Sequence, residues 1–140
     1  MKFQLVSVSG MKYDGDAYEV LVPTRAGTIA VFEHHMPLIS AGAPGVLSVR
    51  KKQSDRDDAL LNFAVNGGIM EVDGQTLRFL SEEVTESDEL SEKEAEAALA
   101  RAQELVKNAG SRVAMEEAQR VLQHSQAKLH VARLKKRSHP

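Results

Sequence analysis

The spacing of hydrophobic residues divides the chain into two parts that meet near residue 86. In the first part, apolar and polar residues alternate over short runs, as Leu61, Phe63 and Val65 do with their neighbours. Alternation with a period of two is typical of strands that bury one face. No stretch in this part has the length and period of a crossover helix. We therefore predict a β-sandwich or flattened barrel of short strands over residues 1–86.

Four turn signals subdivide this region. The polar segment 53–58 and the pair Asp73-Gly74 each lie between two apolar runs, which predicts two hairpins. Pro44-Gly45 and Asn66-Gly67-Gly68 are also interpreted as turns between strands, because glycine adopts positive φ angles without steric cost.

From residue 91 the period changes to three and four residues, which predicts two helices. The apolar stripe of the first helix comprises Ala95, Ala98, Leu99, Ala102, Val106 and Ala109. The stripe of the second comprises Met115, Ala118, Leu122, Ser125, Leu129 and Ala132. Ser91 and Ser111 are expected N-caps, and Asn108-Ala109-Gly110 is a stop signal. Residues 87–140 are therefore expected to form an antiparallel helical hairpin.

Charge is distributed unevenly along this hairpin. Residues 82–96 contain eight acids and one lysine, whereas residues 118–140 contain six lysines or arginines and no acid. In an antiparallel hairpin the acidic start of the first helix lies near the basic end of the second. The alanine-rich stripes give only a thin core, because each buried CH₂ contributes about 0.8 kcal/mol. We expect a hairpin that can exchange one packing surface for another; the alternative is a fixed helical layer on the sandwich.

Composition removes several classes of function. The chain has 140 residues, of which 42% are hydrophobic and 27% charged, with a formal net charge of −2 and no cysteine. A disulfide framework and a thiolate metal site are therefore excluded, and the overall charge indicates no nucleic-acid partner. No apolar run approaches the roughly 20 residues of a membrane span, and the N-terminus has the pattern of a strand rather than of a signal peptide. We expect a protein of the cytoplasmic side.

Candidate site chemistry is weak along the whole chain. No P-loop occurs, and the adjacent His34 and His35 would point to opposite faces of a strand. Asp55, Asp57 and Asp58 lack the spacing of a calcium-binding loop. We therefore expect no catalytic residue, no metal site and no cofactor, and a protein that acts through contacts with partners.

Several motifs occur in an order that is specific to one family. Residues 27–38 resemble a loop that usually reads Gly-Glu-hydrophobic-Gly-Ile-Leu-Pro-Gly-His-Ala-Pro-Leu, and Pro44-Gly45 resembles the start of the strand that follows it. Residues 63–72 are similar to Ala-Val-Ser-Gly-Gly-Phe-Leu-Glu-Val, and an alanine-rich hairpin follows. Over essentially its whole length, the chain resembles the epsilon subunits of bacterial F-type ATP synthases.

This resemblance implies a sandwich of about ten short strands in a non-catalytic subunit of the central stalk, which couples rotor rotation to catalysis. It implies contacts with the gamma subunit, the membrane rotor ring and the alpha/beta catalytic head, at the cytoplasmic face of the bacterial plasma membrane. It also implies that the hairpin can lie on the sandwich or extend along gamma, and that the extended form inhibits ATP hydrolysis. Neither nucleic-acid binding nor membrane insertion is expected.

The loop that contacts the rotor ring in this family corresponds to Phe32, Glu33, His34 and His35, and we expect these residues to make that contact. Thr28 replaces an acid that is usual in the family. Glu33 and His34 replace the usual Pro-Gly, so the geometry of this loop is expected to differ from that of its relatives.

Some members of the family bind ATP on the hairpin through an aspartate and an arginine at its start and two arginines on the second helix. Here these positions hold Ser91, Glu94, His124 and Lys128. A carboxylate at Glu94 repels phosphate, whereas a guanidinium would bind it in a bidentate manner. We therefore predict that the chain does not bind ATP.

The acid-free end of the second helix is expected to make the inhibitory contacts of the extended hairpin. The residues concerned are Arg120, Lys128, Arg133, Lys135, Lys136 and Arg137. Exposed ion pairs each contribute about 1 kcal/mol or less, so the effect should be cumulative and weakened by salt. Two alternatives stay open: a β-sandwich adaptor whose hairpin binds another helical partner, and a nucleic-acid-binding protein that uses this basic end. The scarcity of aromatic residues, at 4%, speaks against single-strand stacking.

Overall fold

The computed structural model describes residues 1–138, except for the side chains of Asp88 and of residues 136–138. His139 and Pro140, the last residues of the predicted hairpin segment 87–140, lie outside the described residues. The strands are β1 (Lys2–Ser7), β2 (Gly10–Asp16), β3 (Glu19–Thr24), β4 (Gly27–Phe32), β5 (Leu38–Arg50), β6 (Leu61–Val72), β7 (Thr76–Ser81) and β8 (Val84–Glu86). The helices are α1 (Glu92–Lys107) and α2 (Arg112–Ser138), with short 3₁₀ turns at Asp57–Ala59 and Ser87–Glu89.

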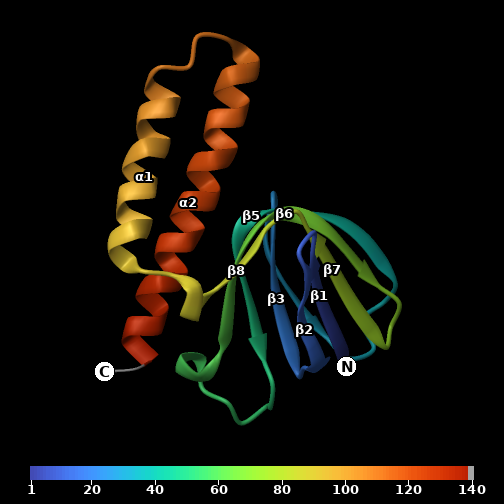
Figure 1. Cartoon of the computed structure of the whole chain (residues 1–140). Helices are drawn as coiled ribbons and strands as arrows, with labels where there is room; N and C mark the ends of the chain where they lie inside the picture. Colours follow the sequence, from blue (N-terminus) through green and yellow to red (C-terminus); the bar gives the residue numbers. More distant parts are fainter. Residues whose placement is uncertain (139–140) are drawn as a thin grey trace.

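The eight strands form one sheet that folds over on itself. Its order is β2-β1-β7-β6-β5-β3-β4, and β8 pairs with β6. β1 and β7 run parallel, and the other described neighbours run antiparallel. The enclosed core comprises Phe3, Leu5, Ala17, Val20, Val22, Val31, Leu47, Val49, Phe63, Val65, Met70, Val72, Leu77, Phe79 and Val84. The predicted sandwich followed by a two-helix hairpin is thus confirmed (Figure 1).

The two long strands, β5 and β6, serve both layers of the sandwich. They pair along residues 38–42 and 68–72 and again along residues 44–49 and 61–66. When the two halves of each strand are counted separately, the eight strands become the ten short strands that the resemblance implies.

The predicted turns at Pro44-Gly45 and Asn66-Gly67-Gly68 are wrong, because both segments lie inside these long strands. Gly67 and Gly68 have φ angles of 73° and 148°, so the backbone bends there without ending the strand. A Cβ atom on Gly68 would lie 2.2 Å from the carbonyl oxygen of Leu80. The glycines therefore permit a bend with close backbone approach, a role that has the same sequence signature as a turn.

The helical hairpin begins and ends at the predicted signals. The Oγ atom of Ser91 accepts a hydrogen bond from the amide of Glu94 at 3.5 Å, and α1 ends before Asn108. The Oγ atom of Ser111 accepts from the amide of Ala114 at 3.1 Å, at the start of α2. These contacts satisfy amide groups that have no partner within the first helical turn.

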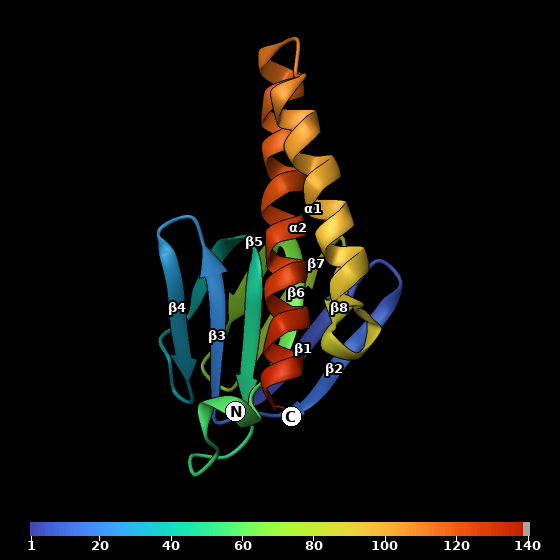
Figure 2. The same cartoon turned by 90° about the vertical axis from the view of Figure 1, so that its left-hand side faces the viewer.

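The hairpin packs against the sandwich through its second helix, α2. The C-terminal half of α2 lies over β5 and β6, whereas the connection between the helices projects beyond the end of the sandwich (Figure 2). Ala95 and Ala102 of α1 and Ala118, Leu129 and Ala132 of α2 are buried, as expected for residues of the two predicted stripes. The structure therefore shows the hairpin in a docked position.

Candidate functional site: the junction between sandwich and hairpin

A small apolar contact joins α2 to the outer face of the sheet. Ala64 of β6 packs with Ala127 and Val131 of α2, and the partly buried Val46 and Leu90 complete this cluster. Ala127 and Val131 do not belong to the predicted stripe of α2, so the helix has a second apolar face directed at the sandwich. The cluster is separate from the main core, and a contact of this size stabilises docking only modestly.

Beside this apolar contact, one carboxylate of the sandwich lies close to a lysine and a histidine of α2. Glu83 lies in the connection between β7 and β8, and its Oε1 atom is 2.8 Å from the Nζ atom of Lys128. The Nε2 atom of His124 is 3.3 Å from Oε2 of the same residue. Residues four apart lie on one helix face, so both side chains reach Glu83 together. We call Glu83, His124 and Lys128 the junction cluster.

The backbone holds Glu83 in place. Its carbonyl oxygen accepts hydrogen bonds from the Oγ atom of Ser81 and from the amide of Asn66, both at 3.1 Å. The hydrogen bond from the backbone amide of Asn66 connects Glu83 to the bend in β6. The sandwich therefore fixes the backbone of Glu83, while Lys128 and His124 of α2 contact its carboxylate.

Burial and charge act in opposite directions within the junction cluster. Burial tends to raise the pKa of Glu83, but the hydrogen bond from Lys128 and the charges of His124 and Lys128 outweigh it, and the pKa lies below its ordinary value. Burial, followed by the charge of Lys128, lowers the pKa of His124, and Glu83 offsets these effects only in part. His124 is only 6% exposed, its Nε2 atom faces Glu83, and the backbone of Val65 also supports its charged form. The site therefore favours a neutral imidazole beside an ionised carboxylate.

A second group of charges joins the two helices. The guanidinium of Arg133 lies 3.5 Å from Glu92 and 3.7 Å from Glu96. This contact confirms that the acidic start of α1 lies beside the basic end of α2. Arg120 pairs with Glu117 of its own helix at 3.3 Å. Lys135 also has an interaction, and the side chains of Lys136 and Arg137 lie outside the described residues.

An open groove of about 1420 Å³ runs between α2 and the bend of β5 and β6. Its helical side carries polar residues, among them Arg120, Gln123 and His130. Pro44 and Gly67 contribute to the opposite side. The groove separates the N-terminal half of α2 from the sandwich. The apolar cluster with the sheet is formed by the C-terminal half of α2, through Ala127 and Val131.

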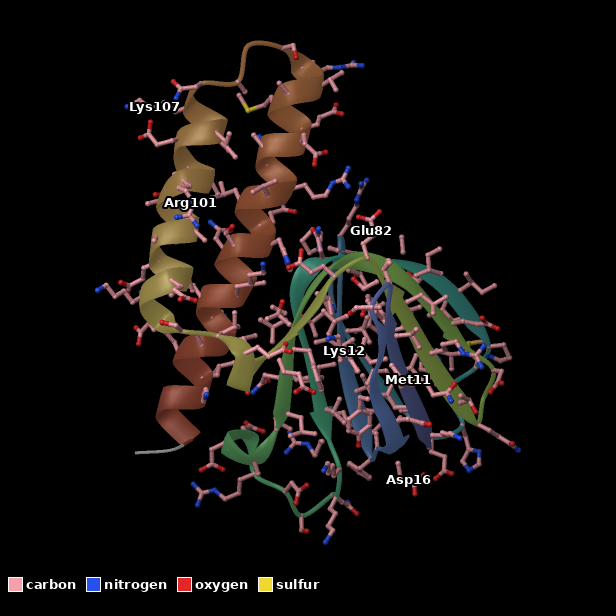
Figure 3. All side chains as sticks on the ribbon, in the orientation of Figure 1. Met11, Lys12, Asp16, Glu82, Arg101 and Lys107 are labelled. Atoms are coloured by element: carbon pink, nitrogen blue, oxygen red, sulfur yellow. The ribbon has the colours of Figure 1, made fainter. Side chains whose placement is uncertain are left out.

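The four residues expected to contact the rotor ring lie at and after the end of β4. Phe32 is 42% exposed and packs edge to face with Tyr18, with ring centroids 5.6 Å apart. His34 has a φ angle of 65°, and its amide donates to the carbonyl oxygen of Gly74. Phe32 and Glu33 line a shallow depression together with Asp16. Figure 3 shows Asp16 at the end of the sandwich remote from Lys107, which lies near the tip of the hairpin.

The positions of the predicted degenerate ATP site have other contacts in this structure. Ser91 caps α1 through the amide of Glu94, whereas His124 and Lys128 meet Glu83. Glu83 was not singled out from the sequence, because it is one of eight acids between residues 82 and 96. The spacing of His124 and Lys128 was the one available signal, since it places both on the same helix face.

Two general properties concern the part of the chain that the structure describes. Within it, no group of three or more His, Cys, Asp or Glu side chains is arranged to hold a metal ion. None of the helices described is both long and apolar enough to cross a membrane.

Known proteins share both parts of this chain. The ATP synthase delta/epsilon chain β-sandwich domain family matches residues 1–87. The ATP synthase epsilon chain of Chromobacterium violaceum is 31% identical over 140 residues, which cover 99% of this chain and 98% of that one. The epsilon chain of a Sulfurihydrogenibium species is 33% identical over a segment that spans 64% of each chain. For epsilon chain 2 of Burkholderia orbicola the matched segment spans 59% of that protein, at 33% identity.

Solved structures share the fold at low sequence identity. A chain of the Euglena gracilis mitochondrial ATP synthase superposes with a TM-score of 0.74 and 15% identity, over 89% of this chain and 76% of that one. A chain of the Tetrahymena thermophila mitochondrial ATP synthase central stalk and c-ring superposes with a TM-score of 0.59 and 14% identity, over 99% and 96% of the two chains.

Proposed function

Since the chain belongs to the ATP synthase delta/epsilon family, we propose that it is the epsilon subunit of an F-type ATP synthase, a non-catalytic part of the central stalk that couples rotation to catalysis. The observation that carries this proposal is the full-length match to an epsilon chain, together with a sandwich and a docked hairpin in one molecule. The chain therefore acts through its contacts with partners rather than through a reaction of its own.

The proposed partners are the gamma subunit, the rotor ring and the alpha/beta catalytic head. The two structural relatives come from assemblies that contain a c-ring, which supports these partners. The subunit then belongs to a membrane-associated complex as a peripheral component, and we place it at the cytoplasmic face of the bacterial plasma membrane.

The depression beside Phe32 and Glu33 is the proposed contact with the rotor ring, together with His34 and His35. Its partly exposed aromatic pair, Phe32 and Tyr18, supports this role. Residues 1–86 would then serve binding, and residues 87–140 would serve regulation.

The basic end of α2 is the proposed inhibitory surface of the extended hairpin. In the docked position, Lys128 is paired with Glu83, and Arg133 is paired with Glu92 and Glu96. Release from the sandwich would free Lys128, whereas the Arg133 contact lies within the hairpin and can move with it. Arg120, Lys135, Lys136 and Arg137 complete this proposed surface. Deletion of residues 87–140 should leave assembly intact and raise ATP hydrolysis by the complex; unchanged hydrolysis would refute the inhibitory role.

The hairpin is proposed not to bind ATP, because Glu94 would repel phosphate and Glu83 is already paired with Lys128. Calorimetric titration of the isolated protein with ATP should give no binding heat. A dissociation constant in the micromolar range would contradict this proposal.

Affinity purification of the tagged protein in mild detergent, with mass spectrometry of the co-purifying proteins, tests the assignment as a whole. Recovery of the alpha, beta and gamma subunits with the rotor ring is the expected result. If a soluble and stable bait recovers none of them, the chain is instead a β-sandwich adaptor for another helical partner.

A further inference from the structure

His124 is an unusual residue for the contact between a mobile helix and its support. It is 6% exposed, both of its ring nitrogens are buried, and its Nε2 atom lies 3.3 Å from a carboxylate oxygen of Glu83. A neutral imidazole tolerates this position, whereas an imidazolium would place a full positive charge in a buried site beside the ammonium of Lys128. The docked hairpin therefore accommodates one protonation state of this residue better than the other.

The groups around the ring compensate for a proton only in part, because burial and the charge of Lys128 outweigh Glu83 and the backbone of Val65. Glu83 faces it from the sandwich, and Lys128 faces it from the next turn of α2; β6 presents the backbone of Val65. Lys128 is the closer partner of Glu83, at 2.8 Å against 3.3 Å for His124. The carboxylate is thus already neutralised by a cation, and a second positive charge would meet the first.

We propose that His124 makes the docked hairpin acid-sensitive, so that protonation of its imidazole releases α2 from the sandwich. Release would move the hairpin towards the extended position, in which it inhibits hydrolysis; this consequence rests on the proposed function. The complex would then hydrolyse less ATP as its surroundings become acidic.

The direction follows from proton linkage. Docking lowers the pKa of His124, so the docked state binds fewer protons than the released state. Docking is then fully stable above the ordinary histidine pKa of 6.5 and weakens as the pH falls through that value towards the lower pKa of the docked state. The pKa of Glu83 lies below its ordinary value of 4.5, so this carboxylate stays ionised between pH 5.5 and 7.5. His124 is therefore the member of the junction cluster that titrates in this window.

Distance measurement on the isolated full-length protein tests the release directly. The chain has no cysteine, so spin labels can be attached to introduced cysteines at Met11 and Arg101, which are exposed on the sandwich and on α1 (Figure 3). One distance is expected at pH 7.5, and the released population should grow at least about threefold by pH 5.5. His124→Gln should abolish this growth. His130→Gln, which removes an exposed histidine of the same helix, should preserve it.

Two further variants separate the histidine from the ion pair. Glu83→Gln should increase the released population at pH 7.5 and retain its growth in acid, because the imidazole stays buried. Lys128→Gln should reduce the growth, because Glu83 is then free to pair with the imidazolium. Equal acid release in wild type and His124→Gln, or a wild-type hairpin that stays docked at pH 5.5, would overturn the proposal.

A titration of the wild-type histidine rings by NMR does not depend on any variant folding. The midpoint of His124 is expected below the ordinary histidine value of 6.5, and a midpoint above that value would also overturn the proposal. Neither measurement needs partner subunits, so a negative result leaves the epsilon assignment intact. A failed co-purification would instead remove only the predicted effect on ATP hydrolysis.

Discussion

At the scale of single residues, the bend in β6 depends on a position that excludes a side chain. Gly68 has a φ angle of 148°, and its backbone lies against the carbonyl group of Leu80 on β7. The bend carries β6 from one layer of the sandwich to the other. It also brings the backbone amide of Asn66 to the carbonyl group of Glu83, which holds the backbone at this member of the junction cluster.

Gly68→Ala should destabilise the sandwich by more than about 3 kcal/mol, because the added methyl group would overlap a backbone carbonyl in a conformation that L residues rarely adopt. Thermal or urea unfolding monitored by circular dichroism measures this change. Gly110→Ala is the matched control, since a Cβ at Gly110 meets nothing within 4 Å. A loss of less than 1 kcal/mol for Gly68→Ala, by the same unfolding measurement, would contradict this reading of the bend.

At the scale of elements, α2 uses two apolar faces. One face packs on α1, and the other presents Ala127 and Val131 to Ala64 of β6. Since the second contact is small and the neighbouring charges are partly exposed, docking has a modest free energy. A helix held in this way can be displaced without unfolding the sandwich.

Val131→Ala should weaken docking by about 2 kcal/mol, because it removes two buried carbons and leaves a cavity. The released fraction, measured by distance between spin labels on the sandwich and on α1, should rise accordingly. Val113→Ala removes the same atoms from an exposed position of the same helix and should change docking by less than about 0.5 kcal/mol. Equal effects of the two substitutions would show that the apolar cluster does not hold the hairpin.

Strands and helix starts could be predicted from the sequence, because a local pattern of residues determines each of them. Alternating residues such as Phe63 and Val65 predicted strands, and Ser91 and Ser111 predicted the helix starts. The bends of β5 and β6 were misread, because a glycine that permits a bend looks the same as a glycine that permits a turn.

The junction cluster could not be predicted in the same way. Its partners are separated by about forty residues, and Glu83 resembles the acids around it in charge and in context. The second face of α2, formed by Ala127 and Val131, was missed because an alanine is compatible with burial and with exposure. These features depend on tertiary contact, which the local pattern does not contain.

At the scale of the whole molecule, the sandwich and the hairpin have separate apolar interiors. The main core extends from Phe3 to Val84 and contains no residue of α1 or α2. In the described part of the chain, the apolar cluster shared by hairpin and sandwich is centred on Ala64 of β6.

A fragment of residues 1–86 should therefore fold alone and unfold cooperatively, with a free energy of unfolding within about 2 kcal/mol of that of the sandwich in the full chain. Urea unfolding of fragment and full chain, monitored by the near-ultraviolet signal of Tyr13 and Tyr18, makes the comparison. An unfolded fragment would mean that the hairpin is part of the folding unit.

The parallel pairing of β1 with β7 also determines when this protein can fold during its synthesis. Residues 2–7 leave the ribosome before the other strands of the sandwich, but their partners at residues 76–81 are made after most of it. Phe3 and Leu5 must therefore remain unburied on the nascent chain until β7 has emerged, and this long-range closure is intrinsically slow. The hairpin is translated only afterwards. The helix that we propose as the moving part is thus added after the sandwich, to a support that can already be complete.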